Sequence, residues 1–166
     1  YTGQNFGARN LPRIRSGIRS AMKLAALFAV TISVGMVLFG RYLLMMFISS
    51  SDADAPAVLE LAYQYLTIMS VTLIILYALH VYRSAIQGMG NTIIPMIAGL
   101  LECVGRVSVA LFLPRIVGEY GLFFAETTAW LFSAVCVMSA FYVTVHRLSA
   151  SEAEIEKDSG LKTGYV

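Results

Sequence analysis

The stretch LAALFAVTISVGMVLFG, residues 24–40, decides the fold because it is long, apolar and free of charge. Three further apolar runs with few charges follow over residues 61–86, 93–113 and 120–145. A helix that crosses a bilayer needs about 20 predominantly apolar residues, whereas a strand of a membrane barrel has about 10 residues and alternates. The sequence therefore predicts an all-α integral membrane chain with four transmembrane helices.

The composition of the whole chain supports this prediction. Of its 166 residues, 58% are hydrophobic and 13% are charged, and the mean hydropathy is +0.73. Soluble domains have about 45–50% apolar and about 25% charged residues, and a chain of this size has too little interior to bury the excess. The lipid bilayer is thus an expected partner. A net charge of +2 is too small for the electrostatic surface that binds nucleic acid, so no nucleic-acid partner is expected.

Three segments follow from the four runs. Residues 1–23 are predicted as the cytoplasmic end of a preceding helix and a basic inner loop. Residues 24–147 form the transmembrane domain, and residues 148–166 form a polar tail that is disordered or a frayed helix. Because the chain starts at Tyr1 without an initiator Met or a signal peptide, we expect it to be part of a longer polypeptide. The missing N-terminal part would then be its partner.

The basic residues predict the orientation. Lys and Arg gather on one side of the membrane, which the positive-inside rule identifies as the cytoplasm. That side carries Arg9, Arg13, Arg15, Arg19, Lys23, Arg83, Arg147, Lys157 and Lys162, whereas the other side carries Arg41 and Arg115. Both ends of the chain are therefore expected in the cytoplasm. The cluster from Arg9 to Lys23 also suits a patch that binds anionic lipid.

Two glycine-containing segments predict tight turns on the cytoplasmic side. The first, GQNxGA, contains Gly3, Gln4, Asn5, Gly7 and Ala8, and the second, QGMGNTxxP, contains Gln87, Gly88, Gly90 and Pro95. In the second segment a glycine can close one helix, Thr92 can cap the next, and Pro95 falls in its first turn. Each segment is predicted to end one helix and start another. Neither is a phosphate-binding loop.

Glu102 and Arg106 are the sharpest feature, because they interrupt the third run near its middle. They lie one turn apart on one helix face, and each costs about 2.5–3.5 kcal/mol at the centre of a membrane helix. They should therefore face protein or water. One interpretation is a proton or cation site at Glu102 with Arg106 as its counter-ion. The other is a structural ion pair that locks helix packing.

Glu126, in the fourth run, lies at a depth close to that of Arg106. A contact between them is geometrically allowed, and Glu126 would then compete with Glu102 for the guanidinium. The simpler interpretation is a carboxylate that reaches the outer membrane surface.

A polar stripe follows one face of the second run. It should line a cavity or bond to neighbouring helices, and its histidine also suits proton relay. The stripe consists of Ser70, Tyr77, His80, Ser84 and Gln87. Cys103 and Cys136 lie in apolar runs without partners at metal-ligand spacing, so we expect buried small side chains and no metal site.

The motifs together resemble the last third of a MATE (multidrug and toxic compound extrusion) transporter. GQNFGARNLPRIRSG (residues 3–17) precedes a run that ends in GRYLLMMF (40–47), and AYQYL (62–66) follows. RSAIQGMGNTIIP (83–95), ECVGR (102–106) and AETTAW (125–130) complete the order. The resemblance covers the chain from Tyr1 to about Arg147.

The resemblance implies a twelve-helix transporter of two six-helix bundles, in which this chain supplies the last four helices of the C-terminal bundle. It implies an antiporter of the plasma membrane, not an enzyme. The expected substrates are cationic or amphipathic xenobiotics, exported in exchange for Na⁺ or H⁺, with no further cofactor. Some Na⁺-coupled members carry a carboxylate on the helix equivalent to the second run, but no Asp or Glu lies between Glu60 and Glu102 here. The coupling role would pass to Glu102 or to upstream residues.

Three alternatives remain open. A flippase for lipid-linked precursors or polysaccharides, from the same superfamily, would be expected to have a more cationic lumen than Arg106 alone provides. A membrane-embedded enzyme would require clustered His, Asp or Ser, whereas His80 and His146 lie apart and no HExxH or GxSxG motif occurs. A non-catalytic four-helix assembly subunit would explain the hydropathy without the charged pair.

Overall fold

The computed structural model describes residues 1–48 and 54–162. The described residues form helices joined by short turns, and no strand occurs among them. The elements are α1 (Thr2–Gly7), α2 (Leu11–Met45), α3 (Ala55–Gly88), α4 (Ile93–Phe112), α5 (Pro114–Val117), the 3₁₀ helix η1 (Glu119–Phe123) and α6 (Phe124–Lys162).

Four helical segments are long and apolar enough to cross a membrane, which confirms the predicted fold class. They are Leu11–Met45, Ala55–Gly88, Ile93–Val117 and Tyr120–Ser151. Each contains one of the four predicted apolar runs. The helices also extend further than expected into residues 1–23 and into the tail.

The basic segment before the first run is not a loop beyond Asn10. Residues 11–23 form the first turns of α2, because the Asn10 Oδ1 atom accepts a hydrogen bond from the Arg13 backbone N–H at 3.1 Å and caps the helix. Pro12 lies in the first turn, where its missing N–H costs little. The arginines of residues 11–23 therefore lie on a helix surface at fixed spacing.

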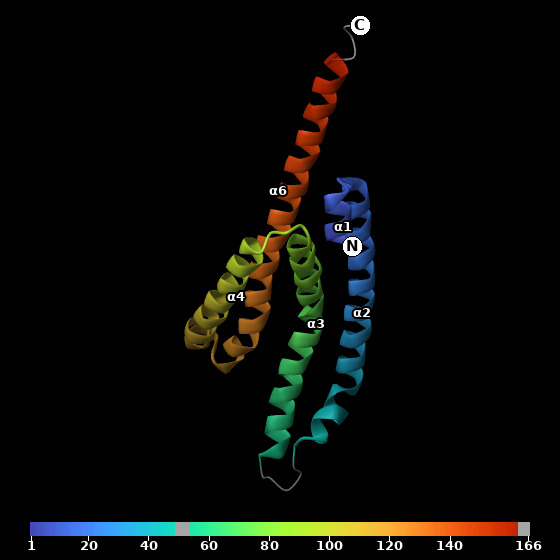
Figure 1. The fold of residues 1–166 in the computed structure, drawn as a ribbon. Coiled ribbons are helices and arrows are strands. Elements are labelled where there is room, and N and C mark those ends of the chain that lie inside the picture. Colours follow the sequence, from blue (N-terminus) through green and yellow to red (C-terminus); the bar gives the residue numbers. More distant parts are fainter. Residues whose placement is uncertain (49–53, 163–166) are drawn as a thin grey trace.

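The polar tail also continues a helix. α6 runs to Lys162 and extends beyond the other helices (Figure 1). Ala, Glu and Lys are strong helix formers and occur repeatedly after Ser151, which accounts for the continuation. Asp52, expected in the outer connection, and residues 163–166 of the predicted tail lie outside the described residues, as do the side chains of Lys157 and Lys162.

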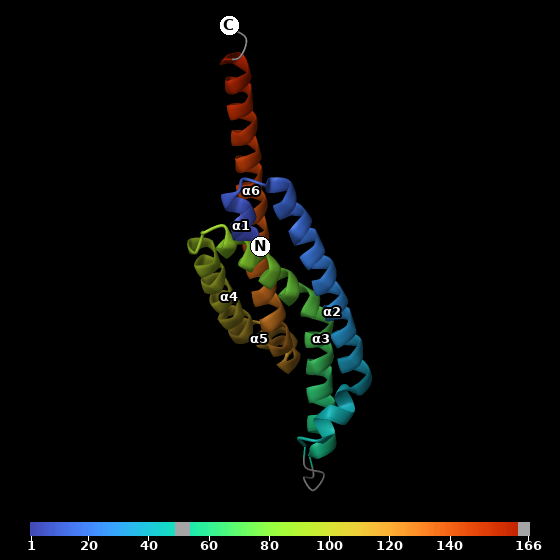
Figure 2. The same cartoon turned by 45° about the vertical axis from the view of Figure 1, so that its right-hand side comes forward.

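The long helices pack as two antiparallel pairs. α2 packs on α3, α4 packs on α6, and the two pairs meet where α3 packs on α6, whereas α3 and α4 touch little. Figures 1 and 2 show both termini at the same end of the bundle as the α3–α4 turn. The main core lies toward that end, where Ile14, Leu79, Ile86, Val137 and Phe141 are buried together.

Large apolar side chains elsewhere are exposed, as expected for surfaces that face lipid or further protein. They include Leu27 and Phe28 on α2, and Leu100 and Val104 on α4. Cys103 is also exposed, so the expectation of burial is wrong for it, whereas Cys136 is half-buried. The reason is that α4 packs chiefly on α6 and leaves its opposite face uncovered.

The two predicted turns on this side are present, with changes in detail. The α3–α4 turn closes at Gly90, whose φ is 84°. Thr92 occupies the N-cap position of α4, but its side chain makes no capping bond; the Asn91 Oδ1 atom instead accepts from the Ile94 N–H at 3.1 Å. After α1, the left-handed residue is Arg9 (φ 54°), not a glycine.

Candidate functional site

Glu102 and Arg106 contact each other near the middle of α4. The Arg106 Nη2 atom lies 3.3 Å from Glu102 Oε1, which is the pair expected from their spacing. The Arg106 side chain is 42% exposed and the Glu102 side chain is 20% exposed. The pair therefore faces other helices only in part.

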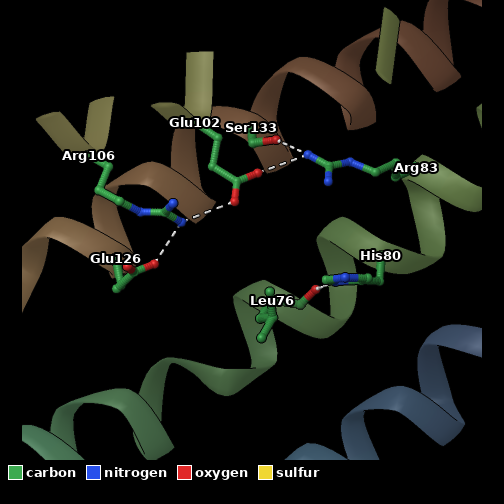
Figure 3. A network of polar contacts seen from close by, with 7 residues as sticks. All are labelled: Leu76, His80, Arg83, Glu102, Arg106, Glu126 and Ser133. Carbon is green, nitrogen blue, oxygen red and sulfur yellow. Dashed lines mark hydrogen bonds and ion pairs between the residues drawn. The ribbon is translucent and has the colours of Figure 1, made fainter. Parts of the chain in front are cut away.

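The second oxygen of Glu102 binds an arginine from another helix. The Arg83 Nη2 atom on α3 lies 2.9 Å from Glu102 Oε2 and also donates to Ser133 Oγ on α6 at 2.9 Å (Figure 3). Ser133 is completely buried and the Arg83 side chain is 24% exposed. Both carboxylate oxygens of Glu102 are thus held, each by a different guanidinium.

Arg83 was missed as a site residue because it was counted among the basic residues that mark the inner face. The direction of its side chain follows from burial that only the structure shows. Arg83 lies four residues after Leu79 and three before Ile86, and the side chains of these two residues are fully buried. Residues at this spacing share one helix face, so Arg83 had to point toward the packed side of α3.

Glu126 also contacts Arg106, as its depth allowed. The Arg106 Nη2 atom lies 2.8 Å from Glu126 Oε2 at the start of α6. The same nitrogen therefore holds Glu102 and Glu126 at once, and the two carboxylates do not exclude each other in this structure.

We call Arg83, Glu102, Arg106 and Glu126 the four-charge network. Figure 3 shows it as a chain of alternating charges that joins α3, α4 and α6. Its two positive and two negative groups cancel, which lowers the cost of placing them at membrane depth. Each Nε atom of the two arginines is buried without a hydrogen-bond partner in the described part of the chain. The guanidiniums thus have more donors than the contacts use.

Small residues bring the helices around the network close together. A Cβ atom at Gly105 would lie 3.1 Å from Phe132 Cδ2, so the glycine permits the close approach of α4 to α6. The Thr127 hydroxyl donates to Thr72 Oγ1 at 3.1 Å and joins α6 to α3. These contacts hold α6 against both α4 and α3 beside the network.

The polar stripe on α3 lies apart from this network. His80 is exposed, and its Nδ1 atom lies 2.8 Å from the Leu76 carbonyl oxygen of its own helix (Figure 3). Tyr77, His80 and Ser84 line a pocket of about 820 Å³ beside α2. Ser70 instead contributes to helix packing, since it is buried and its carbonyl oxygen accepts a bond from the Ser33 hydroxyl. Gln87 is exposed.

The two glycine motifs, far apart in sequence, contact each other. A Cβ atom at Gly3 would lie 2.7 Å from the Gly88 carbonyl oxygen, and one at Gly88 would lie 3.2 Å from Thr2 Cβ. α1 therefore sits directly on the end of α3. Gly3 and Gly88 serve helix packing, whereas Gly7 has open space around it.

The described residues contain no group of three or more His, Cys, Asp or Glu side chains that could hold a metal ion. The arrangement can instead exchange protons or ion-pair partners, because its reactive groups are carboxylates held by guanidiniums.

The comparisons with known proteins agree with this architecture. A family model described as MatE matches residues 1–112, which include both glycine motifs, Arg83, Glu102 and Arg106. No curated protein and no solved structure matches the chain. With four helices able to span a membrane, it is a multi-pass membrane protein. Because the matching model covers most of its length, the chain belongs to the MATE family of membrane transporters.

Proposed function

We propose that this chain is the C-terminal part of a secondary active exporter of cationic or amphipathic xenobiotics, driven by H⁺ entry through Glu102. The transporter would lie in the plasma membrane, with both described ends of the chain in the cytoplasm and the remaining helices as partners. The observation that carries the proposal is the position of Glu102, whose two oxygens join arginines on α3 and α4.

The charge balance supports a role for protonation. A proton on Glu102 would leave Arg83 and Arg106 with Glu126 as the one remaining carboxylate of the network, and so with a net positive charge. The attraction between Arg83 on α3 and Glu102 on α4 would then weaken. Loss of this link would remove a charged tie between the two helix pairs and would leave the packing of α3 on α6 as the contact about which they could move. Alternating access in transporters needs movements of this kind.

The surroundings of Glu102 favour H⁺ over Na⁺ as the coupling ion. Na⁺ is a hard cation and requires several oxygen ligands around one point, as other hard cations do. The groups that hold the Glu102 oxygens are the Nη2 atoms of Arg83 and Arg106, which are positively charged donors. A cation at that point would have to displace both guanidiniums, whereas a proton binds an oxygen directly.

A flippase for anionic lipid-linked substrates is the second candidate; it is supported by the contact of two arginines, Arg83 and Arg106, with Glu102, where the sequence predicted Arg106 alone as a basic group at membrane depth. Each guanidinium is, however, neutralised by a carboxylate. This pairing favours the exporter.

The test measures ethidium efflux from proteoliposomes that contain the full-length transporter, driven by an imposed pH gradient. Glu102→Gln removes the charge at nearly constant shape, and Glu60→Gln is the matched control, because Glu60 also pairs with an arginine but is 51% exposed. We expect Glu102→Gln to lower efflux by about tenfold or more and Glu60→Gln to change it by less than about twofold. Unchanged efflux with correctly inserted Glu102→Gln protein would refute the role of Glu102. Efflux that requires a Na⁺ gradient and ignores the pH gradient would refute H⁺ coupling.

A further inference from the structure

A groove of about 920 Å³ lies between the start of α2 and the later part of α6. The segments that line it, the start of α2 and the later part of α6, lie toward the end of the bundle that carries α1 and the α3–α4 turn (Figures 1 and 2). Its floor and walls are apolar or aromatic and include Tyr82, Phe141 and Val143. The four-charge network does not contribute to it.

The charged residues of this groove are all basic. Arg15, Arg19 and Lys23 line one side from α2, and His146 lines the other side from α6. Because α2 is helical from Leu11, the three α2 residues are spaced by four positions and form a row along one face, roughly 12 Å long. The unexpected helical start of α2 therefore converts a basic segment into a basic edge.

The basic edge has no acidic partner among the described side chains. Within that part of the chain no ion pair involves Arg15, Arg19 or Lys23, and the residues that line the groove include no Asp or Glu. Arg15 is held in place by donating to Ser149 Oγ at 2.8 Å, which also ties α2 to α6. Below this edge, Tyr82 and Tyr142 hydrogen-bond to each other through their hydroxyls at 3.0 Å, so the aromatic floor is polar only at one point.

We propose that this groove binds one anionic phospholipid, with its phosphate at Arg19 and Lys23 and an acyl chain along Phe141 and Val143. The argument is charge complementarity joined to an apolar channel. A free phosphate would use the basic edge but leave the apolar walls unoccupied, and a neutral lipid would use the walls but leave the edge unpaired. An anionic phospholipid satisfies both, and each Lys or Arg near such a surface adds about fivefold to binding.

The site has a structural consequence. A lipid bound there would contact α2, α3 and α6 at once, since Tyr82 lies on α3. It would therefore bridge the two helix pairs at this end of the bundle, on the side of α3 away from α4. The occupant would stabilise their present arrangement.

The test uses the full-length transporter in nanodiscs that contain photoreactive phosphatidylglycerol or, separately, photoreactive phosphatidylcholine, followed by peptide mapping of the labelled sites. We expect phosphatidylglycerol to label peptides that contain Met22 or Val143 about tenfold more than phosphatidylcholine does. Equal labelling by the two lipids would overturn the proposal. Absence of labelling on these peptides would also overturn it and would mean that protein covers the groove.

Two variants separate the groove from the general basic surface. R19Q/K23Q should reduce phosphatidylglycerol labelling by about tenfold or more, whereas R13Q/R147Q, which removes two exposed charges outside the groove, one from α2 and one from α6, should reduce it by less than about twofold. V143W fills the groove without changing charge and should abolish labelling by both lipids. Equal losses in the two charge variants, or labelling that survives V143W, would contradict the proposed site.

Discussion

Arg83 and Glu102 lie 19 positions apart in the chain, yet the Arg83 Nη2 atom is 2.9 Å from Glu102 Oε2. The two residues belong to α3 and α4, helices that otherwise touch little because α4 packs on α6. This ion pair is therefore a direct link between the two helix pairs of the bundle. Its loss should weaken the relative placement of α3 and α4 more than the structure of either helix.

Removal of the Arg83 charge tests this link through stability. Arg83→Met keeps an unbranched side chain in place of the arginine stem but leaves Glu102 with one partner and the Ser133 hydroxyl without its donor. We expect a destabilisation of about 1–3 kcal/mol, because a part-buried carboxylate loses a charged hydrogen bond. Thermal unfolding of the full-length transporter in detergent measures the change.

The matched control is Arg41→Met. Arg41 pairs with Glu60 at 3.2 Å, but both side chains are 51% exposed, so the pair contributes at most about 1 kcal/mol. A shift in the Arg41→Met midpoint as large as that of Arg83→Met would show that the position of the pair does not matter.

Ser133 should contribute through a single hydrogen bond. It is completely buried and its oxygen accepts from Arg83 Nη2 at 2.9 Å, so Ser133→Ala removes a charged hydrogen bond without creating a large cavity. We expect a loss of about 1–2 kcal/mol in unfolding free energy. Ser139→Ala, at an exposed position of the same helix, should be close to neutral. Equal melting temperatures for the two variants would rule out the structural role of the Ser133 bond.

The sequence predicted the helices well because a chain in a lipid bilayer can adopt few backbone structures. Every apolar run of sufficient length must form a helix to satisfy its own backbone, so the four spans followed from hydropathy alone. The helical start of α2 at Leu11 was not predicted, and the tail, predicted as disordered or a frayed helix, continues α6 to Lys162; both segments are polar and lie beyond the apolar runs. Their helicity depends on a cap and on residue propensities.

The site was predictable only within one helix. The Glu102–Arg106 contact follows from their spacing along α4, whereas estimated depth only allowed the contact between Arg106 and Glu126 and did not predict it over a carboxylate at the membrane surface. The Arg83–Glu102 bond depends on how α3 and α4 are rotated about their axes. Hydropathy does not fix the rotation of α3, because its apolar residues lie nearly all round the helix. In the sequence, Arg83 therefore indicates only the orientation of the chain.

Gly105 should be essential for the approach of α4 to α6. A Cβ atom there would lie 3.1 Å from Phe132 Cδ2 and 3.6 Å from Ala129 Cα, so Gly105→Leu would push the helices apart and displace Glu102 and Arg106. We expect a destabilisation of about 1–3 kcal/mol from overpacking. Gly99→Leu is the control on the same helix, because a Cβ atom at Gly99 meets nothing within 4 Å. Comparable thermal midpoints for the two leucine variants would contradict the close packing described at Gly105.

The contact between the two glycine motifs makes Gly3 sensitive to the smallest side chain. A Cβ atom at Gly3 would lie 2.7 Å from a backbone oxygen of Gly88, which cannot move without shifting the end of α3. Gly3→Ala should therefore expose this end of the bundle to protease, whereas Gly7→Ala, in open space, should not. Limited proteolysis of the full-length protein compares the two. Equal cleavage rates for the two variants would contradict the close contact described between Gly3 and the end of α3.

The shared use of Arg106 by two carboxylates leads to an asymmetric double-mutant cycle. The Arg106 Nη2 atom holds both Glu102 and Glu126, so Arg106→Gln weakens two ion pairs while Glu126→Gln weakens one. We expect Arg106→Gln to lower the thermal midpoint more than Glu126→Gln, and R106Q/E126Q to be no less stable than Arg106→Gln alone. The reason is that Glu126, once its partner among the described residues is gone, gains nothing from keeping its charge.

A double-mutant cycle measures this coupling. Interaction energies between residues in contact are about 0.5–3 kcal/mol, whereas the stability effects of substitutions at independent sites are additive. The same cycle on the exposed pair Arg41 and Glu60 should give close to zero. Additive effects at Arg106 and Glu126 would mean that the network acts as separate charges and does not couple the start of α6 to Glu102.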